Sequence, residues 1–181
     1  MIKLETKRLY LREFHIEDGE FFFELNKDPE VVKYTGDKAF ESTEEAREFI
    51  YNYKHYEKFG YGRWLVIEKE SGNKIGFCGL KNNGNYIDLG YRFIKSAWGK
   101  GYATEAAHAV LQAGFQRPQL EEVFVYAHPE NTASLRVIKK LDFQYIDDKY
   151  DKVSKENLPI YRMKRSDYSD KKRLDLGSSP G

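Results

Sequence analysis

The chain has 181 residues, and its 30 lysines and arginines nearly balance 29 aspartates and glutamates, which leaves a formal net charge of +1. This balance gives no argument for a nucleic-acid partner, for which a basic face would be expected, so we expect none. No stretch approaches the roughly 18 apolar residues of a membrane span, and the N-terminus has no apolar signal core, so we expect a cytoplasmic protein. The single cysteine, Cys78, excludes an internal disulfide and fits a reducing compartment.

The first sixty residues predict one strand and two helices. Residues 8–14 (RLYLREF) alternate and are rich in large apolar side chains, which is typical of a strand. A short helix follows and stops near Pro29, because the residue before a proline is biased away from the helical conformation. A second helix is predicted over 41–60, where Ser42 and Glu45 have the spacing of a capping box.

The rest of the chain alternates strands with two further helices. In chain order, the pattern predicts strands over 63–70, 74–82 and 86–94, a helix over 102–115, a strand over 121–127, a helix over 131–141, and strands over 143–150 and 159–168. This order predicts an α+β (mixed α/β) fold with a mostly antiparallel sheet and one strand–helix–strand crossover. We expect one domain over 1–168 and a disordered polar tail over 169–181.

The segment Gly99-Lys100-Gly101 stands just before the helix that is predicted to start at Tyr102. Glycine weakens a helix, so its use here indicates that a ligand approaches the backbone. The first turn of a helix carries free N–H groups and the positive end of the helix dipole, which together favour a phosphate. The alternative is a glycine-rich loop without a ligand. The segment is neither a P-loop nor the dinucleotide pattern, whose third glycine is replaced by Thr104.

Residues 99–106 (GKGYATEA) resemble the acyl-CoA loop of the GNAT superfamily of N-acetyltransferases. The segments 87–98 (IDLGYRFIKSAW) and 131–143 (NTASLRVIKKLDF) resemble the ribosomal-protein N-terminal (alanine/serine) acetyltransferase branch of that superfamily, as do 6–14 (TKRLYLREF) and 27–34 (KDPEVVKY). The resemblance extends from about residue 5 to residue 168. It implies a GNAT-like central sheet with a splayed pair of strands, flanked by helices.

The resemblance also implies acetyl-CoA as co-substrate and no metal. The pantetheine arm would lie where the strand 86–94 splays from the strand 121–127, and the pyrophosphate would lie on the amides of the glycine loop. The implied cofactor-binding residues are Phe93, Ile94, Gly99, Lys100, Gly101, Tyr102, Ala103, Thr104 and Asn131. Phe93 and Ile94 would act through their backbone, and Asn131 would bond the pantetheine arm.

Three positions depart from the family pattern. Ser96 replaces the arginine or glutamine that opens the loop, which removes one side-chain contact. Asp142 replaces a glycine just past a helix, where aspartate tolerates the left-handed conformation moderately well. Val137 stands where many relatives place a tyrosine acid, so the proton donor must be sought elsewhere.

Asp88 and Ser134 are the candidate catalytic residues. Both match positions that the family uses for proton transfer, Asp88 as the base for the amine and Ser134 as the acid for the departing thiolate. Asp88 shares a strand face with Gly90 and Arg92 by alternation. The structural alternatives are that Asp88 pairs with Arg92 or another cation, and that Ser134 completes the cap of its helix.

The sequence therefore predicts an acetyl-CoA-dependent N-acetyltransferase that acts on a primary amine by direct attack in a ternary complex. The acceptor stays open between a protein N-terminus, an antibiotic, a polyamine and an amino acid, and the protein is a monomer or a homodimer. One alternative is a non-catalytic acyl-CoA-binding module on the same fold. A nucleotide-dependent transferase is a third reading.

Several other residues carry simpler predictions. His55 and His108 are expected on the surface and His15 in a cap or loop, with no spacing typical of a metal site. His128 falls close to the predicted cleft, and Tyr34 would line it or cover it. Cys78 lies in an apolar run, so a buried strand position is favoured over a reactive thiol.

Overall fold

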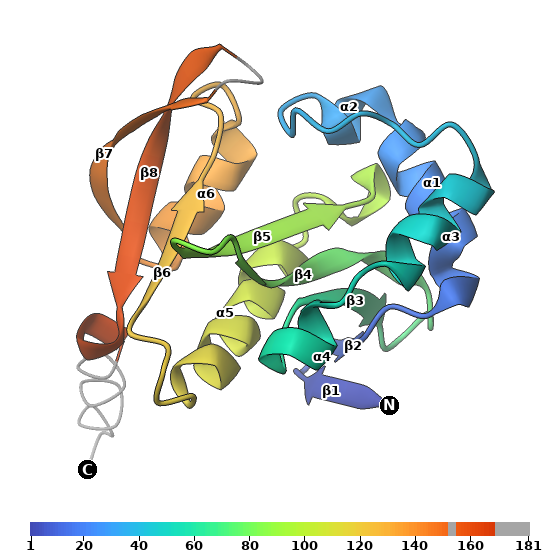
Figure 1. The fold of residues 1–181 in the computed structure, drawn as a ribbon, viewed down its shortest axis with the longest axis horizontal. Helices are drawn as coiled ribbons and strands as arrows, with labels where there is room; N and C mark the ends of the chain where they lie inside the picture. The colour runs from blue at the N-terminus through green and yellow to red at the C-terminus, as the bar shows by residue number, and fades with distance from the viewer. Residues whose placement is uncertain (152–154, 169–181) are drawn as a thin grey trace.

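The computed structural model describes residues 1–151 and 155–168, so the predicted tail at 169–181 lies outside the described residues. One eight-stranded sheet has the order β1-β2-β3-β4-β5-β6-β8-β7 (Figure 1). Its strands are β1 Ile2–Glu5, β2 Leu9–Arg12, β3 Arg63–Glu68, β4 Lys74–Asn82, β5 Ile87–Phe93, β6 Glu122–Tyr126, β7 Gln144–Asp151 and β8 Glu156–Lys164. Among these strands, only β5 and β6 pair in parallel. The predicted mixed fold and its single crossover are confirmed.

Helices cover both faces of the sheet. They are α1 Gly19–Lys27, α2 Pro29–Val32, α3 Thr43–Tyr51, α4 His55–Phe59, α5 Tyr102–Phe115 and α6 Thr132–Lys140, with short 3-10 turns at Ile16–Asp18 and Lys95–Ala97. Phe77 of β4 stacks on Phe22 of α1, whereas Leu80 of the same strand packs against Gly114 of α5. Side chains an odd number of residues apart on a strand point to opposite faces. The α1 face and the α5 face of the sheet are thus distinct.

Each face has its own apolar core. On the α1 face, Phe14, Phe22 and Leu65 form the smaller core, together with Ala46 and Ile50 of α3. The larger core lies mainly between the sheet and α5 and α6. Its fully buried members include Val66, Cys78, Val110, Leu111, Val123 and Ile138. Burial on both faces explains why β3 and β4 read as nearly continuous apolar runs.

The predicted elements differ from the structure at several places. The helix expected over 41–60 is two helices, because Tyr53 and Tyr56 turn their hydroxyl groups onto the backbone of Arg63 and the chain bends after α3. Strand β1 was not predicted, because it pairs only with β2 at the sheet edge. The last predicted strand ends at Lys164, and the residues up to 168 form one helical turn.

Local signals predicted two helix ends correctly. The Ser42 hydroxyl accepts the Glu45 amide at 3.1 Å, which caps α3. Asp142, just past α6, adopts the left-handed conformation with φ of +64°, which is the conformation expected at a position where the family has glycine. Among the described residues, no helix is long and apolar enough to cross a bilayer.

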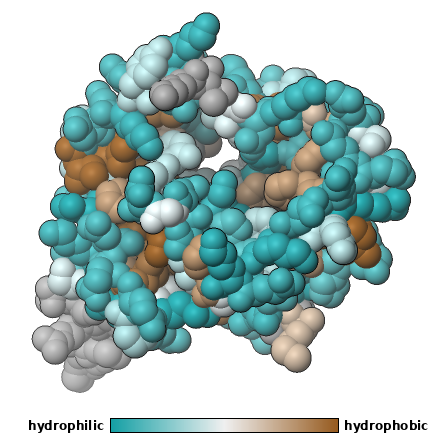
Figure 2. All heavy atoms as spheres, in the orientation of Figure 1, coloured by the Kyte–Doolittle hydropathy of each residue, from teal (hydrophilic) through white to brown (hydrophobic). Residues whose placement is uncertain are grey.

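The sheet opens between β5 and β6. Whereas β4 and β5 pair along their whole length, β5 and β6 share the single register pair Asp88↔Phe124 and then diverge. The surface is hollowed at this place, between the half that carries α6, β7 and β8 and the half that carries α1 to α4 (Figure 2). The predicted splayed pair of strands is therefore present, and it leaves a gap in the middle of the molecule.

Candidate active site

The N-terminus of α5 follows the end of β5, which borders this gap, after the 3-10 turn Lys95–Ala97. Gly99 and Gly101 have φ of +74° and +81°, values that glycine adopts without strain, and Gly101 is the N-cap of α5. In this part of the chain, the first amide after Trp98 with a backbone acceptor is that of Glu105, which donates to the Gly101 carbonyl at 3.1 Å. The amides of residues 99–104 are thus available to an anion, with the helix dipole behind them.

Arg8, which the sequence analysis did not single out, braces this loop. Its Nη1 donates to the Lys100 carbonyl at 2.9 Å, and its guanidinium lies 4.5 Å from the centre of the Tyr102 ring. Its Nε donates to Glu105 at 2.7 Å, and Thr6 donates to the same carboxylate at 2.6 Å. Although burial opposes the shift, these hydrogen bonds lower the pKa of Glu105 below its usual value. The β1–β2 edge thereby fixes the loop.

The backbone of β5 borders the gap on one side. The Ile94 amide donates to Ile75 of β4 at 3.0 Å, so this amide belongs to the sheet ladder. Because backbone groups alternate along a strand, those of Tyr91 and Phe93 face the gap instead. The Phe93 carbonyl already accepts the indole N–H of Trp98 at 2.8 Å. Of the two predicted strand residues, Phe93 therefore offers its amide to a ligand in the gap.

Helix α6 borders the gap on the α5 face. The Asn131 side-chain oxygen caps α6 by accepting the Ser134 amide at 3.1 Å. The hydroxyl groups of Ser134 and Tyr91 lie 2.8 Å apart, a hydrogen bond that joins α6 to β5. Asn131 thus makes the cap, and Ser134 keeps its hydroxyl for Tyr91. Tyr91 is the partner that the sequence analysis missed; burial raises its pKa.

Asp88 lies at the vertex of the gap, on the α1 face. It is 4% exposed, and its carboxylate accepts Nη2 of Arg63 at 2.6 Å and the side-chain amide of Asn83. Arg63 crosses the sheet over Gly90, where a Cβ would collide with the guanidinium, and donates to the Gly79 carbonyl at 3.0 Å. Asp88 is therefore paired with a cation, as the structural alternative held, and the cation is Arg63 instead of Arg92.

Aromatic residues surround the gap on the same face. Tyr126 is 45% exposed at the end of β6, and burial together with the Asp88 charge raises the pKa of its hydroxyl to about 12. The rings of Tyr34 and His128 stack at 4.9 Å, and His128 Nε2 lies 2.5 Å from a Glu156 oxygen. Tyr34 follows α2 and His128 follows β6, so this contact joins the two walls of the gap.

The other candidate residues lie elsewhere. His15 precedes the first 3-10 turn as its N-cap, and His108 is exposed on α5, as expected. His55 is half-buried instead of exposed, because its ring stacks on Tyr53 at 4.9 Å. Cys78 lies in β4 and is fully buried, which confirms the predicted strand position, and burial raises the pKa of its thiol to about 12. In residues 1–151 and 155–168, no group of three His, Cys, Asp or Glu residues could hold a metal ion.

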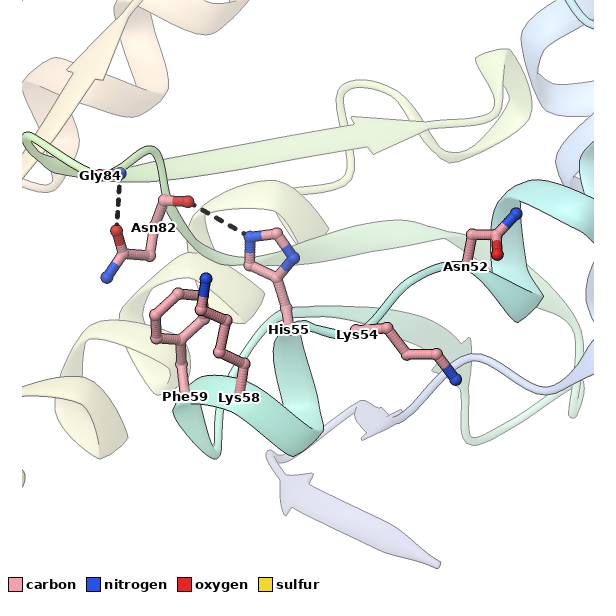
Figure 3. A pocket seen from close by; sticks show the side chains of 7 residues that line it. All are labelled: Asn52, Lys54, His55, Lys58, Phe59, Asn82 and Gly84. Carbon is pink, nitrogen blue, oxygen red and sulfur yellow. Dashed lines mark hydrogen bonds between the residues drawn. The ribbon is translucent and has the colours of Figure 1, made fainter.

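A separate hollow of about 490 Å³ lies beside the β4–β5 turn (Figure 3). It is lined by Asn52, Lys54, His55, Lys58, Phe59, Asn82 and Gly84. His55 Nε2 lies 3.3 Å from the Asn82 carbonyl, and Lys54 points away from that contact. None of the predicted site residues lines this hollow, so the candidate active site is the gap between β5 and β6.

Comparison with known proteins identifies the fold. A family model described as an acetyltransferase (GNAT) domain matches residues 8–144. The chain belongs to the GNAT acetyltransferase family. This acetyltransferase is 34% identical to the uncharacterized N-acetyltransferase p20 of Bacillus licheniformis over 149 residues, which cover 80% of this chain and 83% of p20. The resemblance seen in the sequence is confirmed, and the protein is an acetyltransferase enzyme.

Two solved structures share the fold of this GNAT protein. The ribosomal-protein-S5-alanine acetyltransferase of Vibrio fischeri has a TM-score of 0.76 at 17% identity, covering 91% of this chain and 97% of that one. The spermidine N-acetyltransferase of Vibrio cholerae, solved with CoA and spermine, has a TM-score of 0.76 at 20% identity, covering 91% and 99%. At these identities the likeness shows the fold alone. One of the two structures comes from the ribosomal-protein acetyltransferase branch that the sequence resembles.

Proposed function

We propose that this GNAT protein transfers an acetyl group from acetyl-CoA to a primary amine, with both substrates bound in the gap between β5 and β6. One observation carries the proposal. The strands part after a single register pair, and β5 leads through one short 3-10 turn to the free amides at the start of α5. A thioester on a long arm that ends in a pyrophosphate fits a slot that ends in an anion site.

The residues of this chain suit acetyl-CoA in the following way. The amides of residues 99–104 would hold the pyrophosphate, and a Cβ at Gly99 would meet no atom within 4 Å, so the approach is open. The Phe93 amide and Asn131 would hold the pantetheine arm along the gap. Arg8 keeps the loop in place through the Lys100 carbonyl. Acetyl-CoA supplies the activated acyl group.

Proton transfer is assigned to two groups on opposite sides of β5. Asp88 points to the α1 face, whereas Tyr91, which holds the Ser134 hydroxyl, points to the α5 face. An alkyl amine has a pKa of about 10 and arrives protonated, so Asp88 would take its proton through a water molecule. Ser134 would give a proton to the thiolate. This separation fits an amine that attacks the thioester carbonyl carbon from one side and a thiolate that leaves on the other as the C–S bond breaks.

The two structural neighbours described above are named for amine acceptors, in one case spermidine and in the other a ribosomal-protein alanine. A primary amine is therefore the acceptor class proposed for this chain. The test is thiol release from acetyl-CoA in the presence of peptides, polyamines, amino acids and aminoglycosides. Release that depends on one amine class supports the proposal.

Binding measurements separate the alternatives. Thermal shifts with acetyl-CoA and with ATP distinguish an acyl-CoA site from a nucleotide site, since only a ligand of the native state raises the melting temperature. Stabilisation by acetyl-CoA without release for any amine would indicate the non-catalytic acyl-CoA-binding module. Stabilisation by ATP alone would contradict the placement of CoA in the gap.

A further inference from the structure

Arg8, in the turn between β1 and β2, joins the glycine loop to the first turn of α5. Its Nη1 donates to the Lys100 carbonyl at 2.9 Å, and its Nε donates to the Glu105 carboxylate at 2.7 Å. Its backbone amide also donates to Glu105, at 2.9 Å, and its guanidinium covers the ring of Tyr102. The Lys100 carbonyl thus faces a charged donor that is itself held in place from several sides.

This hydrogen bond sets the direction of the next amide. The peptide between Lys100 and Gly101 is trans, and in a trans peptide the C=O and N–H groups are coplanar and point in opposite directions. Since the Lys100 carbonyl points at Arg8, the Gly101 N–H points to the opposite side of the loop. This N–H has no hydrogen-bond acceptor among the described residues. An anion bound to it would lie across the loop from Arg8.

Glu105 adds an electrostatic role for Arg8. Its carboxylate lies in the first turn of α5, where a negative charge interacts favourably with the helix dipole. A phosphate at the same helix end would be repelled by this charge. The guanidinium of Arg8 neutralises the carboxylate through an ion pair at 2.7 Å. The pair therefore leaves the dipole and the free amides to an anionic ligand.

We propose that Arg8 is the positioning residue of the pyrophosphate site: it aims the Gly101 amide at the anion through the Lys100 carbonyl, and it neutralises Glu105. Arg8 acts through the loop and not by touching the anion. This inference rests on the proposed transfer from acetyl-CoA. Its consequence is that Arg8 affects only the pyrophosphate end of the donor, so it makes the enzyme favour acetyl-CoA over an acetyl thioester without a pyrophosphate.

The test compares two acetyl donors, acetyl-CoA and S-acetylpantetheine, of which only acetyl-CoA carries a pyrophosphate. In Arg8→Met, we expect kcat/KM for acetyl-CoA to fall about 10-fold to 100-fold, the value of a hydrogen bond to a charged group. The loss should appear in KM, while kcat for acetyl-CoA and kcat/KM for S-acetylpantetheine stay close to the wild-type values. Arg8→Lys should lose less, because lysine keeps the charge but lacks the planar fork that serves two acceptors.

Lys69→Met is the matched control. The Lys69 ammonium pairs with Glu5 at 2.6 Å and bonds the Thr6 carbonyl, on the same edge of the sheet as Arg8. This variant removes a cation from that edge without touching the glycine loop. Its affinity for acetyl-CoA should stay at the wild-type value, which excludes a general effect of net charge on an anionic ligand.

The double variant Arg8→Met/Glu105→Gln separates the two roles of Arg8. Removing the carboxylate abolishes the repulsion but does not restore the direction of the Gly101 amide. Acetyl-CoA affinity should therefore rise above that of Arg8→Met and remain below that of the wild type. Recovery of the full wild-type affinity would overturn the positioning of the amide.

Titration with CoA gives an affinity that needs no acceptor, and melting curves verify the fold of each variant. If Arg8→Met does not fold, Arg8→Lys carries the same comparison. Equal losses for the two donors in a folded variant, or unchanged affinity for CoA, overturn the inference while acetyl transfer stands. Failure of the wild type to bind CoA overturns the proposed function instead.

Discussion

At the vertex of the gap, Asp88 is held by Arg63 and Asn83 while the proposed reaction asks it to receive a proton. Asp88→Asn should lower turnover at neutral pH by about 10²-fold to 10⁴-fold, the range of a general base, with acetyl-CoA binding kept. Raising the pH should restore part of the rate, because more of the amine is then deprotonated. Steady-state kinetics across pH measures this.

The pH profile separates catalysis from support. If Asp88 only positions Arg63, the loss of turnover in Asp88→Asn should be the same at every pH. The melting temperature should then also fall, because the buried guanidinium of Arg63 is left without its charged partner. Glu24→Gln, which removes an exposed carboxylate of α1, is the matched control. If Asp88→Asn turns over a verified acceptor at the wild-type rate, Asp88 is not the general base.

The bond between Ser134 and Tyr91 makes a second prediction at the same scale. Ser134→Ala and Tyr91→Phe should each lower turnover by about 10²-fold and leave acetyl-CoA affinity nearly unchanged, because both remove a hydroxyl from one hydrogen-bonded pair. The double variant should be no slower than Ser134→Ala alone, since groups that act as a unit are not additive. Additive losses would mean that the two hydroxyls act independently.

At the scale of elements, the loop before α5 depends on glycine for two reasons, its left-handed backbone and the approach of a phosphate. Gly101→Val should weaken acetyl-CoA binding by about 2 kcal/mol or more, through steric exclusion and lost charge-assisted hydrogen bonds. Lys100→Ala should have a smaller effect, because an exposed lysine contributes little. Isothermal titration measures both.

Gly72→Val is the control for the strained backbone. Gly72 has φ of +70° in the turn between β3 and β4, and a Cβ there would meet no atom within 4 Å. It should therefore lower stability in the same way as Gly101→Val while binding acetyl-CoA normally. Normal binding in a folded Gly101→Val protein would contradict the placement of the pyrophosphate.

For the whole molecule, the buried Asp18 links acid stability to the assembly of the sheet. Asp18 is fully buried and pairs with Arg12 of β2 at 2.7 Å and with Lys74 of β4 at 2.7 Å. Burial alone would raise its pKa, but these partners lower the pKa to about 2 from 3.8. Because the pKa of Asp18 is lower in the folded state than in the unfolded state, ionised Asp18 adds about 2 kcal/mol to the free energy of unfolding above pH 4. This contribution is lost as the pH falls toward 2.

Asp18→Asn removes this titration. Compared with the wild type, it should be less stable near neutral pH, and the difference should shrink as the pH falls from about 4 to 2. Urea unfolding at several pH values gives the two curves. Parallel curves across this range would show that the pairs of Asp18 add no pH-dependent stability.

Much of the fold could be predicted because its signals are local. The alternation in β2 and the apolar stripe of α5 depend on neighbouring residues, and so do the cap at Ser42 and the turn at Asp142. The break between α3 and α4 could not be predicted, because it depends on a contact between Tyr53 and a strand ten residues later. Propensity alone would continue the helix.

The sequence by itself determined the family, the glycine loop and the strand face of Asp88, since these depend on residue identity and on backbone preferences over a few residues. Only the tertiary structure decided that Arg63 pairs with Asp88 and that Arg8 braces the loop from 92 residues away. The physical reason is that a charged side chain finds its partner through the packing of distant segments. No local pattern specifies which acceptor each of several arginines on one face will meet.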